Sequence, residues 1–248
     1  MKKALVVVSF GSSVPSARAA LKKVDETIHK CDSDRDLFSC FTSNFIRKKL
    51  ISQGEEMPSL EEILENLANE GYDDVKVVST HIIPGQEYEK LCGMVDNYRD
   101  KFKEMCITKP LICDAESVQR VAKAVAKAHP VAEDTALVLM GHGTDHLSNF
   151  IYPAMQTAFR TNGNDNIYMA TVEGWPELCH VIDQLDRVGI KKVILAPFLL
   201  VAGDHVMNDM MGPEKDSWKN ILEAKGFEVE CCDKGLSEYP EIVAQYVN

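Results

Sequence analysis

Several motifs that identify common enzyme classes are missing from this chain. It has no Walker A phosphate-binding loop, which argues against nucleotide hydrolysis, no GxGxxG dinucleotide fingerprint and no GxSxG nucleophile elbow. No apolar run approaches the roughly 20 residues that cross a membrane. The eight cysteines are scattered without a CxxC pair, a pattern typical of reduced thiols in a cytosolic protein.

Positive charge is also scarce. Lys and Arg number 27 against 38 Asp and Glu, which gives a formal net charge of -11 at pH 7. Nucleic acids and anionic membranes both attract basic surfaces, and the sequence contains no Lys/Arg-rich block. We therefore expect neither nucleic acid nor a membrane as a partner. The length of 248 residues allows one large α/β domain or two half-sized lobes.

Apolar runs alternate with amphipathic segments along nearly the whole chain, a pattern typical of repeated βα units around a mainly parallel sheet. Strands are expected at 4–10, 36–41, 75–80, 107–112, 135–140, 166–171, 192–198 and 227–232. Helices are expected between them, including 16–30, 59–70, 87–102, 117–128 and 176–187. The first run superficially resembles a signal peptide, but a nearly identical string recurs internally at 136–140. We interpret both as strands and expect a cytoplasmic protein.

The second half of the sequence resembles the first in three places that occur in the same order. Residues 4–11 align with 136–143, residues 36–43 with 166–173, and residues 71–75 with 189–193, at offsets of 132, 130 and 118. This repeat indicates two similar lobes, an N-terminal one at 1–130 and a C-terminal one at 131–248. Two lobes imply a cleft between them, which is a favoured place for a ligand.

Ligand-type side chains follow three expected strands of the second half: His142, Glu173 and His205. The carboxyl ends of parallel strands share one edge of a sheet, so these side chains can converge. Two imidazoles and a carboxylate can bind a divalent metal ion and leave some of its coordination positions free. Such a site suits an ion that must react or leave. Taken singly, Glu173 and His205 are better explained as helix-capping or loop residues. Taken jointly, the three matched strand ends favour a metal site.

The first half carries Phe10, Ser43 and Glu87 at the aligned positions, so only the second lobe is equipped to hold a metal. Glu87 contributes a single acid. His81 ends a strand shortly before Glu87 and is a candidate proton acceptor, because the ordinary histidine pKa lies near neutrality. Another histidine, His129, is expected to be solvated on a polar helix face.

Long blocks of the sequence closely resemble the anaerobic sirohydrochlorin cobaltochelatases of the CbiK type. The most specific blocks are Met-Gly-His-Gly at 140–143 and Val-Ala-Gly-Asp-His at 201–205, and the resemblance covers essentially the whole chain. It implies the class II chelatase fold shared with ferrochelatases, in which two similar α/β lobes surround a tetrapyrrole cleft and work without ATP. The metal belongs to the C-terminal lobe in this scheme.

Carried over by position, His142, Glu173 and His205 match the family's metal-binding residues, and Glu87 matches its acid near the macrocycle. The resemblance thus implies insertion of Co²⁺ into sirohydrochlorin, with no nucleotide or organic cofactor. Glu87, together with His81, would accept the pyrrole protons. Candidate substrate-binding residues lie in the first strand-to-helix turn: Ser9, Phe10, Ser12 and Ser13. Candidate basic partners for the substrate carboxylates are Arg18, Lys22 and Arg47.

Other functions stay open at this point. Imidazole and carboxylate ligands do not choose sharply among Co²⁺, Fe²⁺ and Ni²⁺, so an iron or nickel chelatase fits the same residues. A noncatalytic tetrapyrrole or metal carrier would bind without repeated turnover. A metal-dependent hydrolase would combine the same three residues with a base for water. A homo-oligomer is compatible with the sequence.

Overall fold

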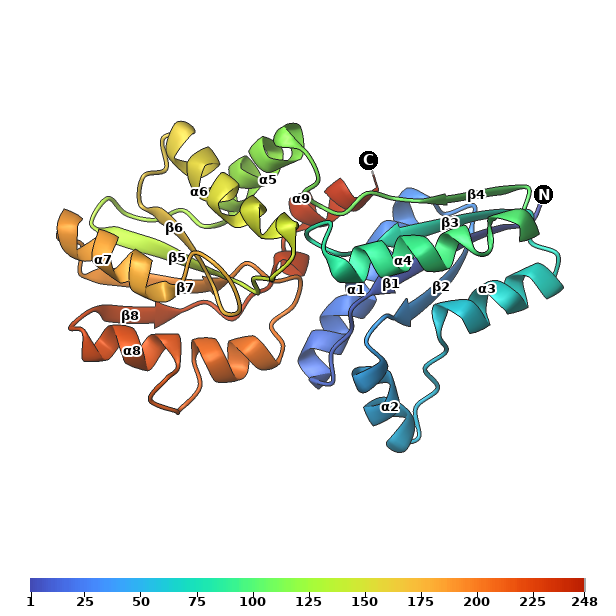
Figure 1. Ribbon diagram of the computed structural model, residues 1–248, viewed down its shortest axis with the longest axis horizontal. Helices are drawn as coiled ribbons and strands as arrows, with labels where there is room; N and C mark the ends of the chain where they lie inside the picture. Colours follow the sequence, from blue (N-terminus) through green and yellow to red (C-terminus); the bar gives the residue numbers. More distant parts are fainter. Residues whose placement is uncertain (248) are drawn as a thin grey trace. The chain divides into compact units, whose positions relative to one another are not determined.

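The computed structural model describes residues 1–247, which form two compact units (Figure 1). One unit comprises Met1–Cys113 and the residues from Val243 onward, and the other comprises Asp114–Ile242. Each unit contains a parallel sheet with helices packed against it, so the predicted α/β class is confirmed.

The first unit is built on a four-stranded parallel sheet in the order β2-β1-β3-β4. Its strands are β1 (Lys3–Ser9), β2 (Asp36–Phe41), β3 (Asp74–Ser79) and β4 (Glu104–Ile107). Its helices are α1 (Pro15–Cys31), α2 (Asn44–Ser52), α3 (Leu60–Asn69), α4 (Gln86–Asp96), η1 (Arg99–Lys101) and η5 (Ala244–Tyr246). The central strand β1 is buried from Ala4 to Ser9, as expected of a parallel strand covered on both faces.

The second unit has a four-stranded parallel sheet in the order β6-β5-β7-β8. Its strands are β5 (Thr135–Gly141), β6 (Ile167–Thr171), β7 (Lys192–Pro197) and β8 (Glu228–Cys231). Its longer helices are α5 (Ala115–Ala128), α6 (Ile151–Thr161), α7 (Leu178–Val188) and α8 (Trp218–Ala224). Short turns of helix complete it: η2 (Leu147–Phe150), the π-helical turn η3 (Val206–Met210), η4 (Leu236–Glu238) and α9 (Pro240–Val243).

The two sheets share one strand order, and their registers reproduce the repeat expected from the sequence. Val8 lies beside Cys40 in the first sheet, and Met140 lies beside Ala170 in the second. These pairs are related by the offsets of 132 and 130 residues, and the offset of 118 relates β3 to β7 in the same way. The sequence repeat therefore corresponds to a repeat in sheet geometry.

The expected strand at 107–112 is misplaced, because β4 ends at Ile107. Leu111 and Ile112 are buried, but they lie beyond the strand, where their N–H groups donate to the carbonyl oxygens of His81 and Ile82. β4 itself is an edge strand whose residues alternate between exposed and half-buried. The apolar run at 107–112 therefore indicated buried residues correctly, but it did not show where β4 lies.

The units divide the chain differently from the expected ranges 1–130 and 131–248. Helix α5 groups with the second unit because it packs against α6, and the residues from Val243 onward group with the first, where η5 packs against α1.

The expectation that His129 is solvated is wrong. His129 caps the end of α5 and is only 9% exposed, and the centroid of its ring lies 5.0 Å from that of Tyr239 in an edge-on arrangement.

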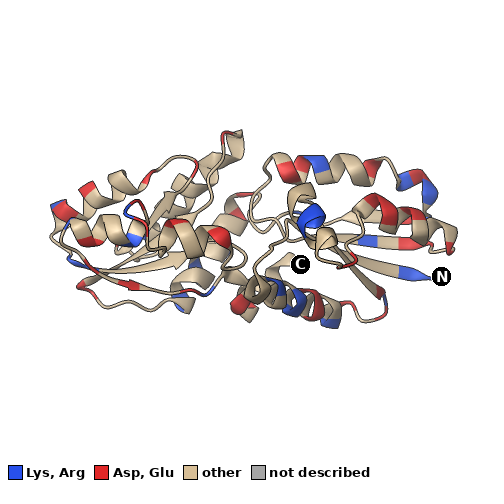
Figure 2. Cartoon of the chain, turned by 90° about the horizontal axis from the view of Figure 1, so that it is seen from below, with Lys and Arg blue, Asp and Glu red and all other residues tan. Residues whose placement is uncertain are grey.

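Charged residues of both signs are interspersed along most of the helices in the view of Figure 2. Helix α2 is an exception, because its only charged residues are Arg47, Lys48 and Lys49. Among the described residues, no helix combines the length and the apolar character needed to cross a membrane.

Candidate metal centre

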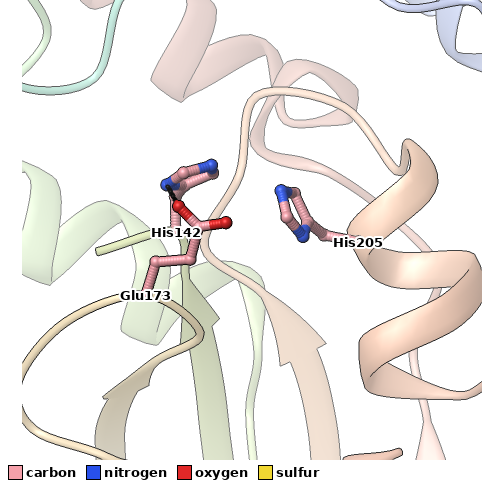
Figure 3. Close-up of side chains that lie close together, drawn as sticks. All are labelled: His142, Glu173 and His205. Atoms are coloured by element: carbon pink, nitrogen blue, oxygen red, sulfur yellow. Dashed lines mark ion pairs between the residues drawn. The ribbon is translucent and has the colours of Figure 1, made fainter. Parts of the chain in front are cut away.

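The ends of β5, β6 and β7 bring three ligand-type side chains together. His142 follows β5 directly, Glu173 lies two residues after β6, and His205 precedes η3. Each offers a ligand atom, and these atoms all lie within 4.8 Å of one another. Figure 3 shows the imidazole of His205 facing the pair formed by the other two side chains. The predicted convergence is confirmed, while the role of these residues as metal ligands stays a prediction.

The three side chains form a compact set that solvent can reach. The rings of His142 and His205 are nearly perpendicular, at 89°, and their centroids lie 4.7 Å apart. Nδ1 of His142 is 3.8 Å from Oε2 of Glu173. The side chains of His142, Glu173 and His205 are 47%, 59% and 33% exposed. A divalent ion bound here would have three protein ligands and open positions for other ligands.

Each imidazole is oriented through its Nδ1 atom. His142 Nδ1 lies 2.8 Å from the carbonyl oxygen of Gly143, and His205 Nδ1 lies 2.7 Å from Oδ2 of Asp209. Both partners are hydrogen-bond acceptors, so each Nδ1 carries the proton and each Nε2 keeps a lone pair for a metal. Asp209 was not predicted as a site residue. Its spacing of four residues from His205 is the sequence signal that indicates such a contact on a helical turn.

The loops that carry His142 and Glu173 are packed directly against each other. The amide nitrogen of Glu173 donates to the carbonyl oxygen of His142 at 2.7 Å. Gly143 has φ of 84°, and a Cβ atom there would lie 2.5 Å from the nitrogen of Gly174. Only glycine therefore fits, because the left-handed backbone and the close approach both exclude a side chain.

Asn149 joins the same two loops from the side. Its Oδ1 accepts the N–H of Thr144 at 3.1 Å, and its Nδ2 donates to the carbonyl oxygen of Trp175 at 2.7 Å. The buried hydroxyl of Tyr152 accepts the N–H of Gly143 at 3.2 Å, and burial raises the pKa of Tyr152. Side chains from η2 and α6 thus hold the loops that carry His142 and Glu173.

A surface pocket of about 1170 Å³ borders Glu173. Three large apolar side chains in its lining are exposed: Leu147 at 74%, Phe150 at 67% and Trp175 at 52%. The sequence analysis did not single out these residues, since exposure of an apolar side chain cannot be inferred from its type. They place apolar surface in a pocket that Glu173 also lines.

In the first unit, two of the predicted substrate-binding serines are engaged in the fold. Ser9 is 3% exposed, and its Oγ accepts the hydroxyl of Thr80 at 2.8 Å. Ser12 is 5% exposed, and its Oγ accepts the N–H of Val14 at 3.1 Å. The hydroxyl of Ser9 is therefore engaged with a residue that follows β3, and that of Ser12 with the turn after β1.

The other two predicted residues of this turn are more accessible. Phe10 is 50% exposed. Ser13 is half-buried, and its Oγ accepts Nζ of Lys49 at 3.0 Å, a basic partner that the sequence analysis missed. Two of the three predicted basic residues are occupied: Arg18 pairs with Glu55, and Arg47 donates to the carbonyl oxygen of Met57 at 3.0 Å.

His81 and Glu87 lie in contrasting environments. Nδ1 of His81 is 2.9 Å from Oγ of Ser79, while its buried Nε2 has no hydrogen-bond partner among the described residues. Burial lowers the pKa of His81 to about 4, against an opposing effect of the Glu87 carboxylate, so the ring is neutral near pH 7. Glu87 lies in the first turn of α4, where Nζ of Lys90 is 2.7 Å from its Oε1.

Residues 3–248 match the family model described as cobalt chelatase (CbiK). The chain is 36% identical over 253 residues to a sirohydrochlorin cobaltochelatase of Salmonella typhimurium, covering 100% of this chain and 94% of that protein. It is 32% identical over 246 residues to the sirohydrochlorin cobaltochelatase CbiKC of Nitratidesulfovibrio vulgaris, covering 98% and 87%. Among solved structures, SirB from Bacillus subtilis with Fe³⁺ has a TM-score of 0.69 at 17% identity, covering 100% and 94%, which is a likeness of fold.

Proposed function

Because the chain belongs to the CbiK family of cobalt chelatases, we propose that this enzyme inserts Co²⁺ into sirohydrochlorin without a nucleotide. One observation carries the proposal: two imidazoles and one carboxylate gather at a single sheet edge and remain open to solvent. A set of three ligands with free positions suits an ion that is passed on, whereas a closed cage of four would retain it.

In this proposal Co²⁺ is a substrate held by His142, Glu173 and His205. The Nε2 atoms of the two imidazoles bind as neutral donors, and the carboxylate of Glu173 supplies one negative charge. The open positions let the macrocycle nitrogens enter the coordination sphere before the protein ligands leave. Apolar surface at Leu147, Phe150 and Trp175, in the pocket that Glu173 also lines, supports a flat organic partner.

Metal insertion also requires a path for protons. Two inner nitrogens of a free-base macrocycle carry protons, and the other two carry free lone pairs. Binding of one Co²⁺ to all four nitrogens therefore breaks two N–H bonds and releases two protons. We assign the acceptor role to Glu87, which holds the position in the first unit that aligns with His205 in the second. His81 is a weak base because of its burial, which suits a relay better than a final acceptor.

Substrate binding in the first unit is assigned to the turn after β1. Phe10 offers an exposed ring for contact with the macrocycle, and Ser13 together with Lys49 offers polar contacts for a substrate carboxylate. Ser9 and Ser12 support the same turn from inside through their hydrogen bonds.

The proposal is tested by mixing the full chain, Co²⁺ and metal-free sirohydrochlorin without ATP and following the absorption spectrum. We expect more than one equivalent of cobalt product per chain. His142→Ala and His205→Ala should each lower turnover by about 100-fold or more, because each removes a direct metal ligand. His29→Ala is the matched control, since this histidine of α1 lies outside the cluster.

The same assay separates the other candidate functions. Product limited to one equivalent would indicate a carrier, and hydrolysis of ester or phosphate substrates would indicate a hydrolase. Parallel reactions with Fe²⁺ and Ni²⁺ decide the metal, because the donor set accepts all three ions. Full turnover in both histidine variants would contradict the assigned metal centre.

A further inference from the structure

The two imidazoles of the metal centre are supported by acceptors of different charge. Nδ1 of His205 lies 2.7 Å from the carboxylate of Asp209, whereas Nδ1 of His142 lies 2.8 Å from the backbone carbonyl of Gly143. A charged acceptor forms the stronger hydrogen bond and makes the imidazole a better electron donor at its other nitrogen. We therefore expect His205 to be the stronger metal ligand of the two histidines.

The fold fixes Asp209 against His205 through the turn η3. Val206 and Met210, the residues that follow His205 and Asp209, are fully buried in the core of the second unit. The polar pair thus shares the neighbouring face of the turn, which is partly exposed at 33% and 43% of the two side chains. Because Val206 and Met210 are anchored in the core, the positions of His205 and Asp209 next to them are set as well.

The end of this turn is also closely constrained. The N–H of Met211 donates to the carbonyl of Val206 at 3.1 Å, five residues back, which is the π-helical pattern. Gly212 follows, and a Cβ atom there would lie 2.3 Å from the carbonyl oxygen of Asn208. Single π-helical turns are rare and occur frequently at functional sites.

We propose that Asp209 is a positioning residue for metal capture. It accepts the Nδ1 proton of His205, holds the ring in one orientation and leaves the Nε2 lone pair directed at the ion. The identity of the ion as Co²⁺ rests on the proposed function, but the coupling between Asp209 and His205 does not. In this proposal Asp209 acts only through His205, because it is not one of the three clustered ligand-type residues.

The experiment measures Co²⁺ binding to the full chain without tetrapyrrole, by calorimetric titration and by the visible d–d absorption of bound Co²⁺. Asp209→Asn should weaken Co²⁺ binding by about 10- to 100-fold, the range found for partners behind metal-bound histidines. The d–d band should also change in shape, because the orientation of one ligand is no longer fixed. Asp209→Glu, which keeps the carboxylate, should restore part of the affinity.

A matched control and a double variant separate positioning from general charge effects. Glu214→Gln removes the same charge from an exposed residue of the segment after η3 and should change the affinity by less than about twofold. In a His205→Ala background, Asp209→Asn should have no further effect, because its only route to the ion is gone.

Two results would overturn the inference. One is wild-type Co²⁺ affinity and an unchanged d–d band in Asp209→Asn. The other is an equal loss of affinity with and without His205. If the wild-type chain fails to produce cobalt-sirohydrochlorin but the coupling of Asp209 to His205 persists, the proposed function fails and the positioning role stands.

Discussion

Gly143 approaches Gly174 so closely that a Cβ atom on the first would lie 2.5 Å from the backbone nitrogen of the second. The loops after β5 and β6 therefore meet backbone to backbone, and neither can yield by rotating a side chain. This contact sets the distance between His142, which precedes Gly143, and Glu173, which precedes Gly174. The spacing of two candidate metal ligands thus depends on two glycines that are not candidate ligands themselves.

Gly143→Ala should separate the two loops. We expect the free energy of unfolding to fall by about 1–3 kcal/mol, because the substitution combines an unfavourable φ with a backbone clash. Co²⁺ affinity should fall with it. The control is Gly163→Ala, which has a similar φ of 78° but open space around its Cβ. It should lose stability and keep Co²⁺ affinity, and equal affinities in the two variants would show that the loop contact is irrelevant to the site.

Glu87→Gln should separate proton transfer from metal binding. Removal of a general base slows proton-transfer chemistry by roughly 10²–10⁴-fold, so cobalt insertion should slow within that range. Co²⁺ binding without tetrapyrrole should stay unchanged, because Glu87 is not among the three clustered residues. Turnover assays and metal titrations check the two halves of this prediction.

Glu89→Gln serves as the control for Glu87, since it removes the same charge from the same first turn of α4. It should retain turnover. Loss of turnover in both variants would indicate that the charge of the turn matters and that Glu87 has no individual role as proton acceptor.

Asp25 should make stability depend on pH. Burial raises the pKa of Asp25 from 3.8 to about 7 in the folded chain, against a hydrogen bond from Ser39 that lowers it. Between these two values the folded state holds a proton that the unfolded state has released. The free energy of unfolding therefore falls as pH rises from about 4 to about 7, by at most about 4 kcal/mol, and the full cost is present above pH 7.

Asp25→Asn should remove this slope and stabilise the chain by about 1–3 kcal/mol at a pH of about 8, where the native carboxylate is charged. Denaturant unfolding at about pH 5 and about pH 8 measures the effect. Glu26→Gln, at the exposed neighbour, should leave the slope in place. An unchanged slope in Asp25→Asn would mean that the buried carboxyl does not carry the proton.

Gly93→Ala should stabilise the first unit. Gly93 lies within α4, is exposed, and has no heavy atom within 4 Å of the place where a Cβ would be. Alanine favours the helix and restricts the unfolded chain, so we expect a gain of about 0.4–1 kcal/mol in thermal or denaturant unfolding. A loss of stability would contradict the open space around this position or its helical conformation.

Much of the fold was predictable because local patterns dominate it. Continuous apolar runs located β1 and β5, which are buried on both faces. The expected helix 59–70 contains α3, which begins after a capping box formed by Ser59 and Glu62. The edge strand β4 was misplaced because its half-exposed residues carry little apolar signal. The burial of His129 was missed for a different reason. It comes from contact with Tyr239, which lies more than a hundred residues away in the chain.

The sequence by itself determined the alternation of strands and helices, the internal repeat and the three ligand-type residues at strand ends. These follow from side-chain type and spacing, and the parallel arrangement of strands brings the ends to one edge. Only the tertiary structure decided which polar groups face those residues. Asp209 behind His205, the Gly143 contact with Gly174 and the buried ring of His81 all depend on packing between segments, which spacing along the chain does not encode.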